Sequence, residues 1–139
     1  MKIGELRLTI DRNLESIPLV GVSVRSIAAY CGLDEETASQ IELAVVEAAN
    51  NSVEHSPDCE GAFVEVVIEQ FSEKLSFHIT DGGEPRSGML AESLPEDPLS
   101  EGGYGLYLIN EISDHAEWVD RNGRNCLHFW KSLENQDRV

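Results

Sequence analysis

The sequence predicts an α/β protein built as a two-layer sandwich, in which a mixed but mostly antiparallel sheet carries its helices on one face. Apolar residues alternate with polar ones in several short segments and recur at helical spacing in three longer ones. These segments follow one another in the order β, α, α, β, β, loop, α, β, β. Elements in this order bury their apolar faces most simply as two packed layers.

The first part of the chain is predicted to form one strand and two helices. Residues 5–10, ELRLTI, alternate apolar and polar side chains, as a strand with one buried face does. Residues 14–31 have helical spacing, and Gly32 ends that helix. Asp34 is predicted to cap a second, longer helix with acidic residues in its first turn, and Pro57 stops it.

Two hairpins are predicted in the remainder of the chain. Residues 62–71 and 74–80 are β-rich runs separated by a short polar stretch. Residues 116–120 and 126–131 form the second pair. The Asn122-Gly123 dipeptide between them suits the positive φ angles of a tight turn.

A segment rich in Gly, Pro, Ser and acidic residues lies between the hairpins, at 81–103, and has no sustained periodicity. An insert of this length is usually either a functional lid or a disordered segment. Helical spacing resumes at 104–114, directly after the glycines. We expect residues 1–139 to form one domain.

The chain is strongly acidic, with 26 Asp and Glu against 10 Lys and Arg and a formal net charge of −16. Its long-range field repels nucleic acid and anionic membranes, so neither is an expected partner. The acidity favours a protein partner, for example a basic one, and solubility alone is the alternative.

Cys31, Cys59 and Cys126 are odd in number and lack CxxC spacing, so they predict neither a disulfide framework nor a zinc site. They are typical of small core residues in a reducing compartment. With neither a signal peptide nor a transmembrane helix indicated, we expect a cytoplasmic protein.

The stretch VEAANNSVEH, residues 46–55, places two asparagines inside a predicted helix, although asparagine is a mediocre helix former. At 100° per residue, Glu47, Asn51 and His55 form one polar line bordering the buried face, whereas Asn50 points away from the core. Asn51 can therefore reach a cleft between helix and sheet. The alternative is that Glu47 and Asn51 are a solvated flank.

Two glycine-containing motifs follow this helix. In ITDGG, Asp81 stands at a predicted strand end, where its carboxylate can accept a hydrogen bond from a ligand while the glycines let the backbone approach closely. In EGGYGLYLI, glycines lead into a helix start, whose free N–H groups can receive phosphate. A simple turn and an ordinary helix start are the alternatives, and neither the Rossmann nor the Walker A pattern is present.

The three motifs together, in this order and spacing, resemble the N, G1 and G2 boxes of the GHKL superfamily of ATP-binding domains, which includes histidine kinases, gyrase, Hsp90 and MutL. The resemblance covers nearly the whole chain. It implies the Bergerat, or histidine-kinase-like ATPase, fold. The short chain and the ending GLYLINEISDHAEWV look like the anti-sigma-factor serine kinases of the RsbW and SpoIIAB type.

The resemblance implies roles for individual residues. Glu47 matches the general base that takes the proton from a serine hydroxyl of a protein substrate. Asn51 matches the residue that binds the nucleotide phosphates through Mg²⁺, which it ligates with its side-chain oxygen. Asp81 matches the aspartate that accepts from the adenine amino group, and Gly83 matches the glycine against which the base lies.

The G2 motif supplies the phosphate-binding end. Gly103 and Gly105 match the glycines whose N–H groups hold the phosphates, and Tyr104 and Leu106 belong to the same cofactor-binding stretch. The resemblance also implies a flexible ATP lid at about residues 84–102.

The resemblance leaves the roles of three charged or ionisable residues open. His55 occupies a position where relatives often carry a basic residue near the phosphates, and a packed histidine is an equal alternative. Glu101 stands where some relatives carry an arginine. Arg25 is a candidate to supply the missing cation, and a surface salt bridge is the alternative.

Other positions depart from the family pattern. Glu84 and Pro85 replace the second glycine of the G1 box, so a stiffer loop is expected beside the adenine pocket. Many relatives support the adenine aspartate with a threonine on a late strand. Here Asn125 or Cys126 stands there instead.

The resemblance implies an anti-sigma factor kinase that binds Mg-ATP, phosphorylates a serine on a small anti-anti-sigma antagonist and sequesters a sigma factor by partner switching, which regulates transcription. A homodimer is implied, with Val22 and Ile27 as apolar candidates for its contact. The alternatives are a non-catalytic ATP- or ADP-binding partner-switching module and an acidic interaction protein that binds no nucleotide.

Overall fold

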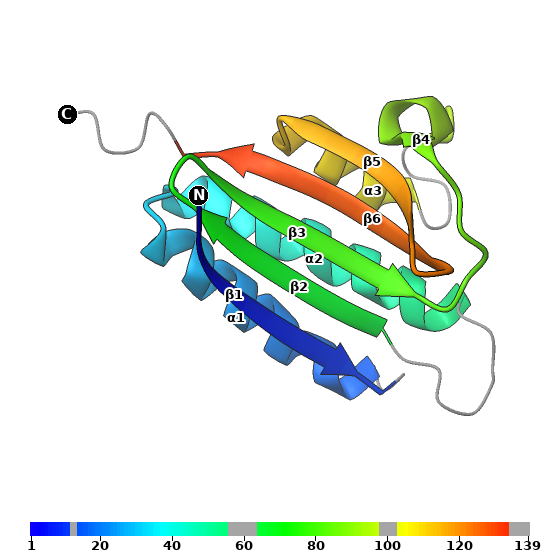
Figure 1. Cartoon of the computed structure of the whole chain (residues 1–139), viewed down its shortest axis with the longest axis horizontal. Coiled ribbons are helices and arrows are strands. Elements are labelled where there is room, and N and C mark those ends of the chain that lie inside the picture. The colour runs from blue at the N-terminus through cyan, green and yellow to red at the C-terminus, as the bar shows by residue number, and fades with distance from the viewer. Residues whose placement is uncertain (12–13, 56–63, 98–102, 134–139) are drawn as a thin grey trace.

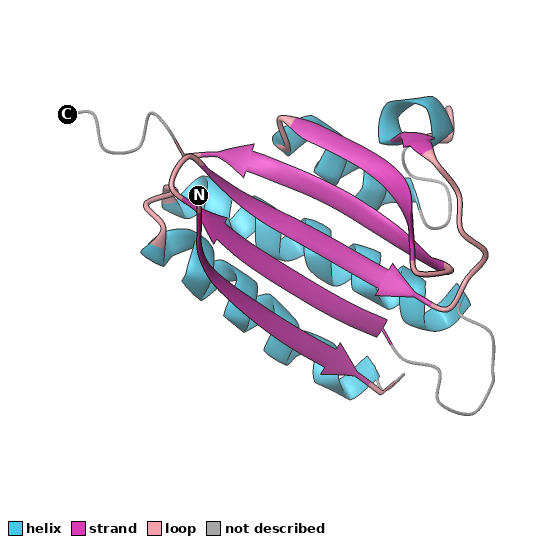
Figure 2. Ribbon diagram, in the orientation of Figure 1, coloured by secondary structure: helices cyan, strands magenta, loops and turns pink. Residues whose placement is uncertain are grey.

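A six-stranded sheet forms one layer of the protein, and the helices cover one of its faces (Figures 1 and 2). The computed structural model describes residues 1–11, 14–55, 64–97 and 103–133. The strands are β1 (Lys2–Ile10), β2 (Val64–Phe71), β3 (Lys74–Asp81), β4 (Gly88–Met89), β5 (His115–Arg121) and β6 (Arg124–Ser132). The helices are α1 (Ile17–Tyr30), α2 (Glu35–His55) and α3 (Gly103–Ile112), with short 3-10 turns η1 (Leu14–Ser16) and η2 (Leu90–Ser93).

The sheet has the strand order β1-β2-β3-β6-β5-β4. Every strand pair in the described ranges is antiparallel, so the predicted sandwich is confirmed while the sheet is not mixed. Both predicted hairpins are present, as β2-β3 and β5-β6. Their inner strands, β3 and β6, pair in the middle of the sheet and bring Asp81 opposite Asn125.

The ends of the first two helices follow the residues predicted for them. Gly32 adopts φ +99° after α1, and the N–H of Leu33 donates to the carbonyl of Ala28 at 3.1 Å, which is a Schellman ending. Asp34 caps α2, since its Oδ1 accepts a hydrogen bond from the N–H of Thr37 at 2.8 Å. Pro57 lies outside the described residues.

The core lies between the helices and the inner face of the sheet. Phe77 of β3 and Phe129 of β6 stack there with ring centroids 4.8 Å apart. The face of α2 that packs on the sheet is apolar and buried, and it includes Ile41, Ala44, Val45 and Ala48. None of the helices in the described ranges combines the length and apolar composition needed to cross a bilayer.

Part of the segment that lacks periodicity has regular structure. Gly88 and Met89 of β4 pair with β5, and the turn η2 follows at once. Leu90 is completely buried in the core. Neither element was predicted from the sequence, because a two-residue strand leaves no periodic pattern.

The other face of the sheet carries a row of histidines. His78 and His128 stack with ring centroids 4.3 Å apart, and Nε2 of His78 lies 2.7 Å from a carboxylate oxygen of Glu69. Burial lowers the pKa of His78, a shift that electrostatic interaction with His128 and Arg121 reinforces and the Glu69 hydrogen bond opposes. Burial also raises the pKa of the nearby Cys126 thiol.

Candidate functional site

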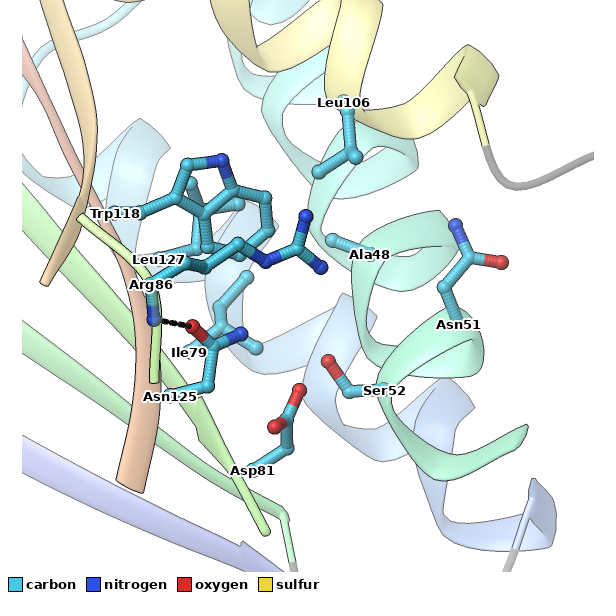
Figure 3. A pocket seen from close by; sticks show the side chains of 10 residues that line it. All are labelled: Ala48, Asn51, Ser52, Ile79, Asp81, Arg86, Leu106, Trp118, Asn125 and Leu127. Atoms are coloured by element: carbon cyan, nitrogen blue, oxygen red, sulfur yellow. Dashed lines mark hydrogen bonds between the residues drawn. The ribbon is translucent and has the colours of Figure 1, made fainter. Parts of the chain in front are cut away.

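A cavity of about 240 Å³ opens between α2, α3 and the end of the sheet where β3 finishes (Figure 3). Its lining combines apolar side chains with a few polar groups, which is typical of a small-molecule site. The lining residues are Ala48, Asn51, Ser52, Ile79, Asp81, Arg86, Leu106, Trp118, Asn125 and Leu127.

Helix α2 forms one wall of the cavity. Its contributions are Ala48, Asn51 and Ser52, which share one side of the helix because of their i, i+3 and i+4 spacing. Asn50 is not among the lining residues, which agrees with the predicted separation of the two asparagines. Asn50 is nevertheless half-buried rather than a fully exposed surface residue.

Glu47 lies just outside this lining, under the first turns of α3. A Cβ atom at position 105 would lie 2.5 Å from the Cβ of Glu47 and 3.2 Å from the backbone nitrogen of Ala48. Only glycine permits so close an approach of one helix to another. Gly105 therefore keeps the start of α3 directly beside Glu47.

Asp81 stands at the end of β3 with its carboxylate at the cavity (Figure 3). Its Oδ1 accepts a hydrogen bond from the N–H of Gly83 at 2.8 Å. A Cβ at position 83 would lie 3.0 Å from that oxygen, so glycine keeps the turn open. Oδ2 has no hydrogen-bond donor within the described part of the chain, which leaves it available to a ligand.

Asn125 lies opposite Asp81 on β6 and is only 4% exposed. Its Oδ1 accepts a hydrogen bond from the N–H of Arg86 at 3.2 Å. The neighbouring Cys126 belongs to the opposite face of the sheet, where its Sγ lies 3.9 Å from Nδ1 of His78. Of the two residues left open by the sequence, Asn125 is therefore the one that faces the cavity.

Trp118 of β5 lines the cavity and is hydrogen-bonded to the turn η2. Its Nε1 donates a hydrogen bond to Oγ of Ser93 at 2.8 Å, and that hydroxyl donates to the carbonyl of Leu90 at 2.9 Å. The foot of the predicted lid is therefore attached to the sheet by a strand pair, a hydrogen bond and a buried leucine.

The cavity lining has one negative and one positive side chain, Asp81 and Arg86. The guanidinium of Arg86 lies over Trp118, 4.0 Å from the ring centroid. Arg25 is not part of the lining, and its guanidinium lies 3.5 Å from carboxylate oxygens of both Glu35 and Glu42. Arg25 thus has the surface salt bridges that were the alternative to a role in the site.

The sequence profile of the histidine kinase-like ATPase domain family matches residues 10–131. The chain belongs to the histidine kinase-like ATPase family. The match spans every element that lines the cavity, and the predicted resemblance to the GHKL superfamily is confirmed.

The relatives of this ATPase domain include proteins named serine-protein kinase RsbW. The one from Halalkalibacterium halodurans is 29% identical over 126 residues, covering 85% of this chain and 77% of the relative. The one from Bacillus mycoides is 22% identical over 134 residues, covering 91% and 84%. These matches agree with the predicted resemblance to RsbW-type kinases.

A solved structure has the same fold. It contains the RsbU and RsbW domains of Rv1364c from Mycobacterium tuberculosis, and the match has a TM-score of 0.65 at 16% identity. It covers 93% of this chain and 32% of that longer chain, so this ATPase domain corresponds to about a third of it.

The remaining predicted residues lie at the start of α3 and the end of α2. Gly103 is the first residue of α3, and Tyr104 beside it is 42% exposed and does not line the cavity. Leu106 does line it. His55 is the last residue of α2, and its side chain lies outside the described part, as does Glu101.

Sequence reasoning missed Ser52, Arg86 and Trp118 as cavity residues. The i+4 spacing of Ser52 from the buried Ala48 was a signal that could have found the first. The other two had no such signal, because Arg86 lies within an irregular loop and Trp118 reaches the cavity only through the register of β5.

Proposed function

We propose that the chain is an anti-sigma-factor serine/threonine protein kinase that uses Mg-ATP to phosphorylate a small antagonist protein. The observation that carries the proposal is the meeting of the three motifs at one cavity, since Asn51, Asp81 and Leu106 all line it. Relatives named serine-protein kinase RsbW support the same reaction.

The adenine would lie at the end of the cavity formed by β3 and β6. The free Oδ2 of Asp81 is suited to accept a hydrogen bond from the exocyclic amino group, which would favour adenine over guanine. Ile79 and Leu127 supply an apolar floor for the base. Asn125 holds the loop after Asp81 through its bond to Arg86.

The phosphates would lie toward the start of α3. Backbone N–H groups at Gly103 and Gly105 and the helix dipole suit this charge. Asn51 offers one amide oxygen, and no three His, Cys, Asp or Glu side chains of the described ranges are grouped to cage a metal. This donor set fits Mg²⁺, which takes most of its ligands from phosphate and water and would neutralise phosphate charge there.

Glu47 would act as the general base. Its carboxylate takes the proton of the substrate serine while the serine oxygen bonds to the γ-phosphorus and the bond from that phosphorus to the β-phosphate oxygen breaks. The close packing of Gly105 on Glu47 supports this role, because it holds the phosphate-binding turn beside the base.

Partner switching would follow from nucleotide-dependent order in the lid at about 84–102, within a single domain of residues 1–139. A ligand that favours one lid conformation also favours whichever partner binds that conformation, here a sigma factor or the antagonist. A cytoplasmic homodimer is part of this proposal. Val22 on α1 is 61% exposed and is available for the dimer contact, whereas Ile27 is packed against the core.

A non-catalytic ATP- or ADP-binding module is the second candidate. Arg86 occupies part of the cavity, and Pro85 stiffens the loop that carries it. A protein that only exchanges partners tolerates both features, whereas it has no need of Glu47.

The test compares Glu47→Gln with wild type, using calorimetry for Mg-ATP binding and labelled phosphate transfer to a candidate antagonist. We expect Glu47→Gln to keep ATP affinity within about three-fold and to lose at least 100-fold in transfer, as removal of a general base does. Glu36→Gln is the matched control, because Glu36 is an exposed residue of the same helix far from the cavity. Transfer at the wild-type rate in Glu47→Gln would remove the catalytic assignment. Wild-type binding of ATP without any transfer would favour the non-catalytic module.

A further inference from the structure

Trp118 gives the cavity a fixed aromatic wall. The residue is 6% exposed, and its indole N–H is held by Ser93 at 2.8 Å. One face of the ring is turned toward the cavity, and the guanidinium of Arg86 lies on that face, 4.0 Å from the ring centroid (Figure 3). A ligand entering here therefore meets Arg86 before it meets the indole.

A hydrogen bond fixes the backbone of Arg86, whereas its side chain is exposed to solvent. Its N–H donates to the buried Asn125, which fixes the residue opposite the end of β3. The residue as a whole is exposed although it covers a buried tryptophan, so the other face of the guanidinium remains accessible. The guanidinium forms no ion pair within the described parts of the chain.

We propose that Arg86 is a base-stacking residue of the nucleotide site, with the purine lying on the free face of the guanidinium and Trp118 supporting the other face. This rests on the proposed function and adds a residue to it. A guanidinium is planar and stacks on aromatic faces, which an ammonium does not do. The purine would thus be read at its edge by Asp81 and held at its face by Arg86.

The position of Arg86 favours the base over the phosphates. The backbone N–H of Arg86 bonds to Asn125, which pairs with Asp81, and these two residues belong to the strands that would hold the adenine. The phosphate-binding turn belongs to α3, on the other side of the cavity, where Gly105 packs on α2. The cation–π contact with Trp118 also holds the guanidinium of Arg86 at the end of the cavity where the adenine would lie.

The test measures Mg-ATP affinity by calorimetry in wild type and in three variants. These variants separate the effect of a planar side chain at position 86 from the effect of its positive charge. Arg86→Ala removes both and weakens ATP binding about ten-fold, as loss of a base stack does. Arg86→Lys keeps the charge and remains about as weak as Arg86→Ala. Arg86→Tyr keeps a plane and retains affinity within about three-fold of wild type.

Arg7→Ala is the control for net charge, because Arg7 is an exposed arginine of β1 that pairs with Glu5 and Glu65 away from the cavity. Its ATP affinity should match wild type. Emission from Trp118, measured in a Trp130→Phe background, should change on ATP binding in wild type and less in Arg86→Ala. Thermal unfolding of each variant checks that the exposed Arg86 site tolerates the changes.

Three results would overturn this assignment alone while ATP binding by wild type stands. Affinity restored by lysine but not by tyrosine would assign Arg86 to the phosphates. Unchanged ATP affinity in Arg86→Ala would show that the side chain does not contact the nucleotide, and tighter binding would show that it obstructs the cavity. Equal losses in all three variants would exclude a stacking role. A wild type that binds no ATP would overturn the proposed function and this inference with it.

Discussion

Replacing Gly105 with alanine tests the close contact between α3 and α2. The new Cβ would lie 2.5 Å from the Cβ of Glu47 and 3.2 Å from the backbone nitrogen of Ala48. Carbon atoms pack best about 3.5–4.0 Å apart, so the first contact is roughly 1 Å too short. Neither obstacle is the end of a side chain that can rotate away, so α3 itself must move.

The expected cost follows from this geometry. Overpacking of this kind costs about 1–3 kcal/mol, and alanine regains up to about 1 kcal/mol over glycine through helix propensity. We therefore expect a net loss of about 1–2 kcal/mol in the free energy of unfolding. For a domain of this size that corresponds to a fall of roughly 3–7 °C in Tm.

The measurement is urea denaturation followed by circular dichroism, with Gly21→Ala as the matched control. Gly21 also faces α2 from a helix, but its added Cβ would meet side-chain atoms, namely Val46 Cγ2 at 2.8 Å and Glu42 Oε2 at 3.3 Å. Glu42 can rotate away, and displacing one Val46 methyl costs less than moving a whole helix. The helix gain offsets part of this cost, so we expect a smaller loss. If Gly105→Ala is as stable as Gly21→Ala, the reasoning about the α3 contact is wrong.

Two further predictions concern Asp81 and His78. Asp81→Asn should keep the turn, because the amide oxygen can still accept a hydrogen bond from the N–H of Gly83. The variant should lose at least about ten-fold in ATP affinity, because the charge-assisted hydrogen bond to adenine is lost. Unchanged affinity in calorimetry would remove the adenine assignment. Burial lowers the pKa of His78 below 6.5, so the unfolded chain takes up the proton first as the pH falls. The free energy of unfolding should therefore fall from about pH 7 to about pH 5.5, and less steeply in His78→Gln. Equal slopes in urea titrations would contradict the burial argument.

The main elements could be predicted from the sequence because each has a long periodic pattern or a specific end signal. Gly32 and Asp34 behave as their residue types predict, and the line of Glu47 and Asn51 follows from helix geometry alone. These are local properties, and they do not depend on how distant segments meet.

The parts that could not be predicted depend on how distant segments of the chain pack together. The choice between Asn125 and Cys126 is decided by the pairing of β6 with β3, since a shift of one residue would exchange their faces. Arg86 and Trp118 come together only because β5 lies beside β6 and the loop after β3 leads to β4, which pairs with β5. β4 was missed because two residues carry too little pattern.

The pairing of β3 with β6 also has a consequence for how the protein is made. Trp118, Asn125 and Leu127 come from the last hairpin, whereas Ile79 and Asp81 come from the earlier one. A ribosome-bound chain has no complete ligand pocket until that final hairpin has emerged and docked against its predecessor. Such long-range pairing slows folding. Because the pocket is incomplete before β5-β6 docks on β3, nucleotide can stabilise this domain only after that docking step.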